Sequence, residues 1–261
     1  MNCSYWQNYK INLLTAGLRA IFASCVFALL GLCLDACGGS HVRREAVRQA
    51  APVQVARHEL TASVVNHWTE VEAILSLGSE PRAPAPKGAI PDPPTYSSCI
   101  AYSARSAEYG PNPTTAQLKA HCERRYRELR HEALEVLIGY YWVSEAAAEA
   151  GVTVTRKELD GVEEGGSRSR AAFERYLFLT HESPADAQLL AERDLLTTKL
   201  FLQLERTIRA KGAKTAKQWT AILLKEARAF TRHWISLTSC KAGYIVPKCK
   251  QYKGPFALFI Q

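Results

Sequence analysis

The chain has 261 residues, of which 47% are apolar and 22% are charged, with a formal net charge of +8. That length suits one large domain or two small ones, and the composition is that of a globular chain rather than a disordered one. Acidic and basic residues are interleaved through most of the chain, which favours an ordinary solvated surface over a nucleic-acid site. The sequence shows no internal repeat, glycine-rich phosphate loop or cysteine pair at zinc spacing.

The beginning of the chain has the pattern of an export signal. Basic residues precede an unbroken apolar run over residues 21–34, which is short for a membrane-spanning helix. Residues 34–37 (LDAC) resemble the lipobox of a bacterial lipoprotein. We expect residues 1–36 to be a removed signal peptide and Cys37 to carry the lipid that holds the protein at the extracytoplasmic face of the cell membrane. An uncleaved signal anchor is the alternative, and residues 37–51 form a polar leash in either case.

Export leaves four cysteines that can be oxidised, Cys99, Cys122, Cys240 and Cys249. An even number of cysteines in an oxidising compartment indicates disulfides. We predict the pairs Cys99–Cys122 and Cys240–Cys249, because the partners are close in sequence and each pair flanks a loop. The rival interpretation is a Cys/His metal site, since His121 adjoins Cys122. Neighbouring residues on a helix point about 100° apart, so these two do not converge on one ion without a turn.

The most regular pattern in the chain predicts one long amphipathic helix from Thr114 to Ala150. Its apolar positions recur every three or four residues, as they do along one side of a helix. Thr114 and Gln117 form a capping box at its start, and Gly151 is placed to end it. The predicted inward side consists of Leu118, Cys122, Tyr126, Leu129, Ala133, Val136, Tyr140, Val143 and Ala147.

The remaining elements are also mostly helical. A proline-rich connector over residues 79–98 cannot continue a helix. Short strands are predicted near residues 52–60, 244–246 and 257–260, where the last two would pair with the first. The fold class is therefore all-α, or mainly helical, with residues 52–261 forming one domain around the long central helix. Further helices are predicted at residues 61–77, 155–164, 170–180, 184–211 and 215–237.

No residue pattern in the chain favours catalysis. The seven histidines are scattered, mostly in charged helical contexts, and no nucleophile motif such as Gly-x-Ser-x-Gly occurs. Paired carboxylates can act as acid and base, but Asp160, Glu163 and Glu164 are more simply the exposed end of a short helix. We therefore predict no catalytic, metal-binding or cofactor-binding residues.

Three successive aromatic residues, Tyr140, Tyr141 and Trp142, lie in the second half of the long helix. Side chains at consecutive helical positions fan over about 200°, so the three cannot all face one core. Tyr140 continues the inward side, which leaves Tyr141 and Trp142 for a second surface. That surface either packs against another helix of the domain or presents apolar contacts to extended client peptides. Tyr141 and Trp142 are the candidate client-binding residues.

Several segments resemble a known chaperone family. A helix ending in small residues and acids, followed by the pattern Gly-Val-Thr-Val-Thr-x-x-Glu-Leu, is similar to the N-terminal chaperone domain of SurA- and PrsA-like peptidyl-prolyl isomerases. Other segments look like the actinobacterial lipoprotein form of this family. The segments that carry the resemblance are residues 60–68, 91–100, 114–122, 151–159, 230–234 and 240–249.

The resemblance implies a helical chaperone domain over residues 52–261 whose partners are unfolded or newly exported polypeptides, with no nucleic acid bound. In the isomerases, a catalytic parvulin domain precedes the closing helix. Here only residues 212–217 join the two helices concerned, so we expect a chaperone-like protein without catalysis. Two alternatives remain: a peptidyl-prolyl isomerase by family membership, and a helical adaptor lipoprotein with one folded partner.

Overall fold

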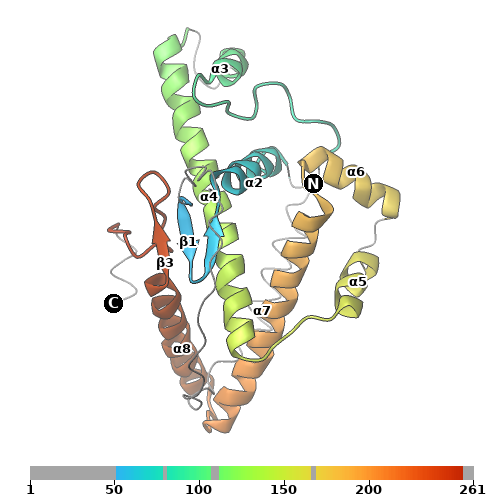
Figure 1. Ribbon diagram of the computed structural model, residues 1–261, viewed down its shortest axis with the longest axis vertical. Helices are drawn as coiled ribbons and strands as arrows, with labels where there is room; N and C mark the ends of the chain where they lie inside the picture. Colours follow the sequence, from blue (N-terminus) through green and yellow to red (C-terminus); the bar gives the residue numbers. More distant parts are fainter. Residues whose placement is uncertain (1–50, 79–80, 107–111, 166–168, 255–261) are drawn as a thin grey trace, which may run out of the picture.

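A computed structural model describes residues 51–78, 81–106, 112–165 and 169–254. The fold is mainly helical, as predicted from the sequence (Figure 1). The strands are β1 (Val53–Val55), β2 (His58–Leu60) and β3 (Thr238–Cys240). The helices are α2 (Ala62–Leu75), α3 (Ser97–Ser103), α4 (Thr115–Glu149), α5 (Arg156–Gly165), α6 (Arg170–Thr180), α7 (Pro184–Ala210) and α8 (Ala216–Ser236). The predicted signal peptide, Cys37, most of the leash and residues 257–260 lie outside the described ranges.

Helix α4 is the predicted long helix, and its 35 residues extend about 50 Å. Its start is the predicted capping box: Gln117 N–H donates to the Thr114 hydroxyl over 3.3 Å, and Thr114 N–H donates to the Gln117 side chain over 2.8 Å. Its end is also confirmed, because Gly151 has the left-handed φ of +65° that favours glycine there. Helices α2, α3 and α7 and strand β1 all pack against α4 (Figure 1).

The three strands form one antiparallel sheet in the order β2-β1-β3. Val53 pairs with Leu60 on one side and with Cys240 on the other, so the sheet joins the two ends of the described chain. The strand predicted at residues 244–246 is not formed; these residues lie in turns closed by hydrogen bonds from Tyr244 N–H to Lys241 and from Cys249 N–H to Val246. The pairing partner of β1 instead directly follows α8.

The main core lies where the sheet, α2, α4 and the end of α8 meet. Burial along α4 follows the prediction at both ends, at Leu118, Cys122, Leu129, Ala133 and Ala147. Between them the buried side is rotated from the predicted one, because the sheet and α2 cover that side of α4 more closely than α7 covers the other. Leu134, Leu137, Ile138 and Trp142 are buried there, whereas Val136, Tyr140 and Val143 are only partly buried.

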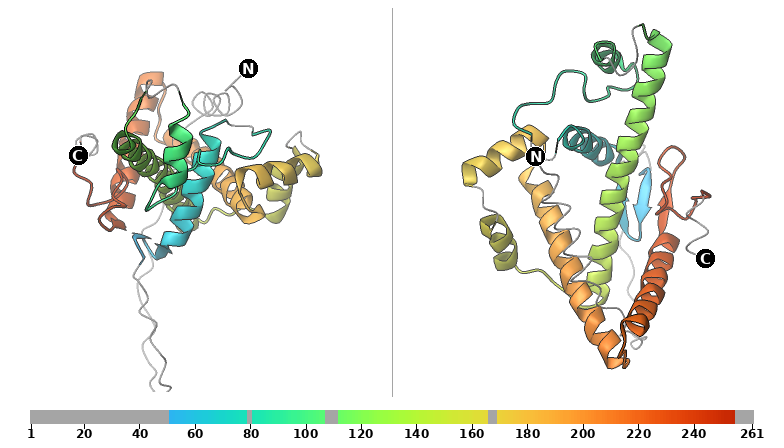
Figure 2. Two further views of the ribbon diagram at one scale, coloured as in Figure 1. Left: turned by 90° about the horizontal axis from the view of Figure 1, so that it is seen from above. Right: turned by 180° about the vertical axis from the view of Figure 1, so that it is seen from behind.

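Helices α7 and α8 form a hairpin that extends beyond the main core (Figures 1 and 2). Leu204, Ile208 and Leu223 form a smaller apolar cluster between these helices. Both helices begin where the sequence predicts, and each is capped: Ser183 N–H donates to Asp186 over 2.7 Å, and Thr215 N–H donates to Gln218 over 3.2 Å. Helices α5 and α6 lie on the other side of α7 from α4 (Figure 2).

Both predicted disulfides are present, Cys99–Cys122 and Cys240–Cys249. The first attaches α3 to the first turns of α4. The backbone N–H groups of Ser98 and Cys99 donate to the Asp92 carboxylate over 2.9 and 3.0 Å, which caps the start of α3. Helix α3 therefore depends on α4 and on one covalent bond for its position.

Replacing Cys99 and Cys122 together by alanine should release α3 while leaving the main core folded. In the chain-entropy model a disulfide closing a loop of this size contributes about 3 kcal/mol, and α3 packs chiefly on α4. Amide hydrogen exchange should become faster in residues 97–103 and remain unchanged in the second half of α4. The matched control, Cys240→Ala with Cys249→Ala, should speed exchange in β3 instead. Unchanged protection of α3 would contradict this assignment.

Candidate functional site

Each of the three successive aromatic residues of α4 contacts a different element. The Tyr140 hydroxyl donates to Glu192 Oε2 of α7 over 3.3 Å. The Tyr141 ring lies 4.6 Å from the His58 ring of β2. The Trp142 indole N–H donates to Thr238 of β3. One turn of α4 therefore holds α7, the β1–β2 hairpin and β3 in place.

Trp142 is part of the main core, whereas a residue that binds clients would have to be exposed. Its side chain is only 5% exposed, and its indole N–H donates to the Thr238 hydroxyl over 2.8 Å. The Phe230 ring lies 6.3 Å from it, and Lys248 Nζ lies 5.7 Å from the ring centroid. Trp142 therefore lacks the exposure that a client-binding residue needs, because the fold already uses both its ring and its polar atom.

Tyr141 also belongs to the scaffold. It is partly buried and packs against the main core beside His58. Burial raises the pKa of its hydroxyl. Of the two alternatives for the aromatic group, packing within the domain accounts for both candidate residues, so an apolar client surface has to lie elsewhere.

The most exposed large apolar side chain in the described part of the chain is Phe178 of α6, which is 73% exposed. It follows the inward-facing Leu177 directly, so the helical period that buries one leucine turns the phenylalanine outward. Val162 of α5 and Leu202 of α7 are each 44% exposed. We call α5 and α6 together the α5–α6 arm. Phe178 was not identified from the sequence, because the helical period gives the direction of a side chain but not whether a neighbouring element covers it.

The α5–α6 arm is held by three buried leucines, Leu159, Leu177 and Leu179, and by polar contacts to α7 and α2. Lys199 Nζ of α7 donates to the backbone oxygen of Thr153 over 2.6 Å and lies 2.7 Å from Glu158 Oε1. The hydrogen bond from Lys199, followed by those from Thr155, lowers the pKa of Glu158 to about 2. At the other end of the arm, His181 Nδ1 lies 2.6 Å from Glu70 Oε1 of α2. Exposed polar contacts of this kind contribute little stability, and the leucines that the arm buries are fewer than the apolar side chains of the main core, so the arm is less firmly fixed than that core.

A group of ionisable side chains fixes the corner between α6 and α7 against α2. Glu182 is 7% exposed, accepts a hydrogen bond from the Tyr176 hydroxyl over 3.3 Å, and has its pKa raised by burial. His67 Nε2 of α2 lies 2.9 Å from Asp186 Oδ2, the same carboxylate that caps α7. The Ser183 hydroxyl donates to the same Asp186 oxygen over 2.6 Å, so this group joins α2 to the start of α7.

Asp160 of the predicted carboxylate cluster pairs with Arg156 over 2.8 Å, and the side chains of Glu163 and Glu164 lie outside the described part. Within the described residues, no three His, Cys, Asp or Glu side chains come together in a way that could hold a metal ion. In the same part of the chain, none of the helices combines the length and apolar character needed to cross a membrane.

Comparisons with protein families, with curated proteins and with solved structures found no match for this chain. The function has to be argued from its own surface and contacts.

Replacing Trp142 by phenylalanine should lower the free energy of unfolding by about 1–2 kcal/mol. An aromatic ring remains, but it is smaller than the indole, so part of the buried packing is lost together with the hydrogen bond to Thr238. Tyr141→Phe is the matched control, and it should change stability by less than about 0.5 kcal/mol because its ring still packs on His58. Urea unfolding measures both. A fully stable Trp142→Phe protein that bound unfolded polypeptide less well would instead restore this residue to a client surface.

Burial, followed by the nearby Glu192 carboxylate, raises the pKa of Tyr140 to about 12 from the ordinary 10.0. The neutral hydroxyl is therefore the form that the folded protein favours, and its contribution is fully present below pH 10. As the pH rises from about 10 to 12, the unfolded chain ionises first and this contribution is lost. Tyr140→Phe should be less sensitive to pH than the natural protein over this interval in urea unfolding. Parallel pH profiles for the two proteins would show that Tyr140 does not carry the effect.

Proposed function

We propose that this protein is a chaperone-like, non-catalytic binder of unfolded or newly exported polypeptides, anchored at the extracytoplasmic face of a membrane. The observation that carries the proposal is Phe178, a large aromatic side chain left 73% exposed on an arm that polar contacts attach to the core. A large aromatic side chain that is exposed to solvent indicates a surface that a partner covers when it binds.

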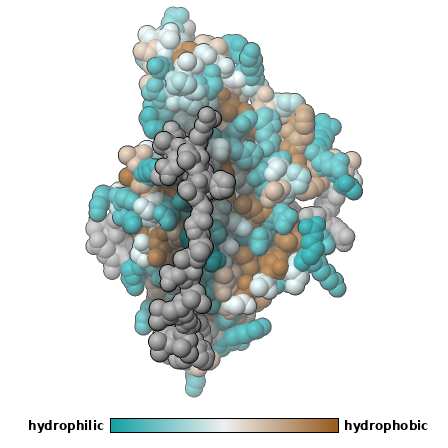
Figure 3. Space-filling model, in the orientation of Figure 1, coloured by the Kyte–Doolittle hydropathy of each residue, from teal (hydrophilic) through white to brown (hydrophobic). Residues whose placement is uncertain are grey.

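The surroundings of Phe178 fit an extended, apolar partner better than a small molecule. Unfolded segments present aliphatic and aromatic side chains at irregular spacing, and scattered apolar contacts on separated helices accommodate such variation. Apolar surface gathers on the face of the molecule where α7 and the connection from α4 to α5 run (Figure 3). Because the arm is attached outside the main core, by a few leucines and by the polar contacts of Lys199 and His181, it can adjust to different segments without opening that core.

The compartment is supported by the cysteines. Cys99–Cys122 and Cys240–Cys249 take up all four cysteines of the described residues, and disulfides persist in oxidising, extracytoplasmic environments. The predicted signal and lipidation at Cys37, together with the resemblance to the chaperone domain of the SurA and PrsA type, agree with this assignment. In such a compartment a newly exported polypeptide is the abundant unfolded partner.

The Phe178→Ser protein should suppress aggregation of a heat-unfolded client enzyme less well than the natural protein, and Phe178→Ser with Leu202→Ser less well still. Leu237→Ser is the matched control, since Leu237 is also exposed, at 39%, but lies beyond the end of α8 and away from the arm. Light scattering at stoichiometric amounts measures the effect, and all variants should keep the helical circular dichroism of the natural protein. No suppression by the natural protein would refute the chaperone proposal.

Two further measurements separate the alternatives. Proline-limited refolding of a model protein should proceed at its uncatalysed rate, and a faster rate would favour a peptidyl-prolyl isomerase. Crosslinking in cells should trap many partners, whereas a helical adaptor would trap one folded partner.

A further inference from the structure

The positive charge of the chain is concentrated in its last described segment. Residues 206–254 contain twelve lysines and arginines but only one acidic residue, Glu226. The preceding residues, 123–205, contain sixteen acidic and eleven basic residues. The charges that appear interleaved over most of the sequence therefore leave one strongly basic region, which includes the end of α7, all of α8 and the segment after it.

The acidic groups of the α7–α8 hairpin do not offset this charge at the surface. Glu226 is 5% exposed, and its carboxylate lies 2.8 Å from Lys211 Nζ. Glu205, just before the basic region, is also 5% exposed and lies 2.6 Å from Arg209. Both carboxylates are buried against the hairpin, so the exposed positions of α8 present cations to the solvent.

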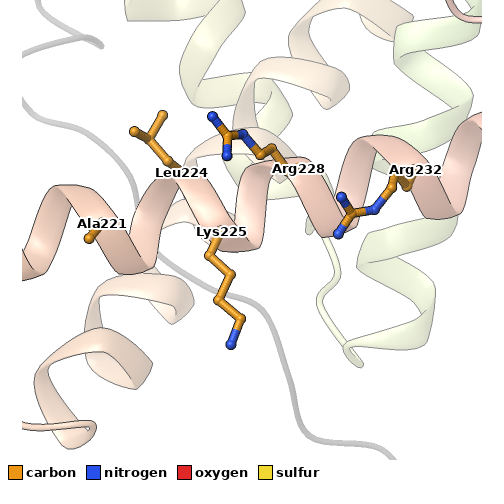
Figure 4. A pocket seen from close by; sticks show the side chains of 5 residues that line it. All are labelled: Ala221, Leu224, Lys225, Arg228 and Arg232. Atoms are coloured by element: carbon orange, nitrogen blue, oxygen red, sulfur yellow. The ribbon is translucent and has the colours of Figure 1, made fainter. Parts of the chain in front are cut away.

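The outward side of α8 combines these cations with an exposed leucine. A hollow on this side is lined by Ala221, Leu224, Lys225, Arg228 and Arg232, which project from successive turns of the helix (Figure 4). Leu224 and Lys225 are adjacent and the other steps are three or four residues, so the five side chains lie within about 100° of the helix circumference, along one face. Leu224 is 50% exposed. We call these five residues the basic face of α8.

We propose that the basic face of α8 docks on the surface of a lipid bilayer that contains anionic phospholipids. Lysine and arginine attract anionic headgroups, while an apolar side chain between them can enter the boundary between headgroups and acyl chains. A polyanion such as a nucleic acid would use the cations but gains nothing from Leu224. The two disulfides also indicate a compartment outside the cytoplasm, where the protein meets a membrane surface more readily than it meets a nucleic acid.

This docking is independent of client binding and compatible with it. In both Figure 1 and Figure 2, α8 and the α5–α6 arm lie on opposite sides of α4. A protein that rests on the bilayer through α8 therefore has the α5–α6 arm on the side of α4 away from the lipid. Docking through α8 would also complement the lipid anchor predicted at Cys37, because attachment at one residue leaves the body of a protein free to rotate.

The test uses the full chain reconstituted in vesicles of neutral phosphatidylcholine, or of phosphatidylcholine mixed with anionic phosphatidylglycerol. Acetylation of individual lysines by a water-soluble reagent is followed by mass spectrometry. Lys225 should react several-fold more slowly on the anionic vesicles, and high salt should remove the difference. Lys157 of α5 is the internal control in the same molecule and should react equally on both. Because the anchor is present in both samples, the comparison reports only the orientation of the body.

Arg228→Gln should lower the equilibrium constant for docking of α8 on anionic vesicles by about fivefold, the effect expected for one basic residue near the surface. Lys225 of this variant should therefore be acetylated faster on anionic vesicles than Lys225 of the natural protein. Arg170→Gln on α6 is the matched control and should leave it unchanged. Equal acetylation of Lys225 on both vesicles would overturn the proposal. Protection of Lys225 on neutral vesicles by an added single-stranded oligonucleotide at physiological salt would also overturn it, and would assign the face to nucleic acid. Neither result depends on the chaperone assay.

Discussion

The structure depends on the pairing of β1 with β3 across the middle of α4. A helix about 50 Å long cannot bury its own apolar side, so other elements have to cover it. Val53 and Val55, both fully buried, provide that cover together with Cys240 of the paired strand. The hydrogen bond from Trp142 to Thr238 fixes the position of β3 along α4, because a buried indole N–H without an acceptor costs free energy. Two segments almost two hundred residues apart are thereby held on one turn of one helix.

The features that the sequence predicted correctly are those whose causes are local. The capping boxes at Thr114, Ser183 and Thr215 each need only a side chain three residues away, and all three occur at the expected helix starts. The glycine after α4 and both disulfides are similarly short-range features. Short strands are different, since a three-residue strand exists only if a partner accepts its hydrogen bonds. The third strand was therefore misplaced, at Tyr244 instead of at Thr238.

The same distinction explains the error in the candidate site. The helical period correctly showed that Tyr140, Tyr141 and Trp142 point in different directions, but it does not show what lies in each direction. The sheet covers the side of Trp142, and α7 reaches only the side of Tyr140. The exposed aromatic side chain is Phe178 of α6, which directly follows the buried Leu177. In the sequence, both residues are apolar and nothing distinguishes the exposed one from the buried one. Exposure is a property of the neighbours and follows from the sequence only after the fold is known.

The contacts of the molecule differ in kind between its centre and its edges. At the centre, α2, α4 and the sheet are joined by buried apolar side chains, which tolerate little movement. At the edge, the α5–α6 arm is attached by three buried leucines and by the exposed polar contacts of Lys199 and His181, which are weakened by water and salt. Such an arrangement allows an exposed phenylalanine to change its surroundings while the Trp142 site keeps its geometry. The free-energy cost of moving the arm then consists of a few exposed polar contacts and the burial of three leucines, which is smaller than the cost of opening the main core.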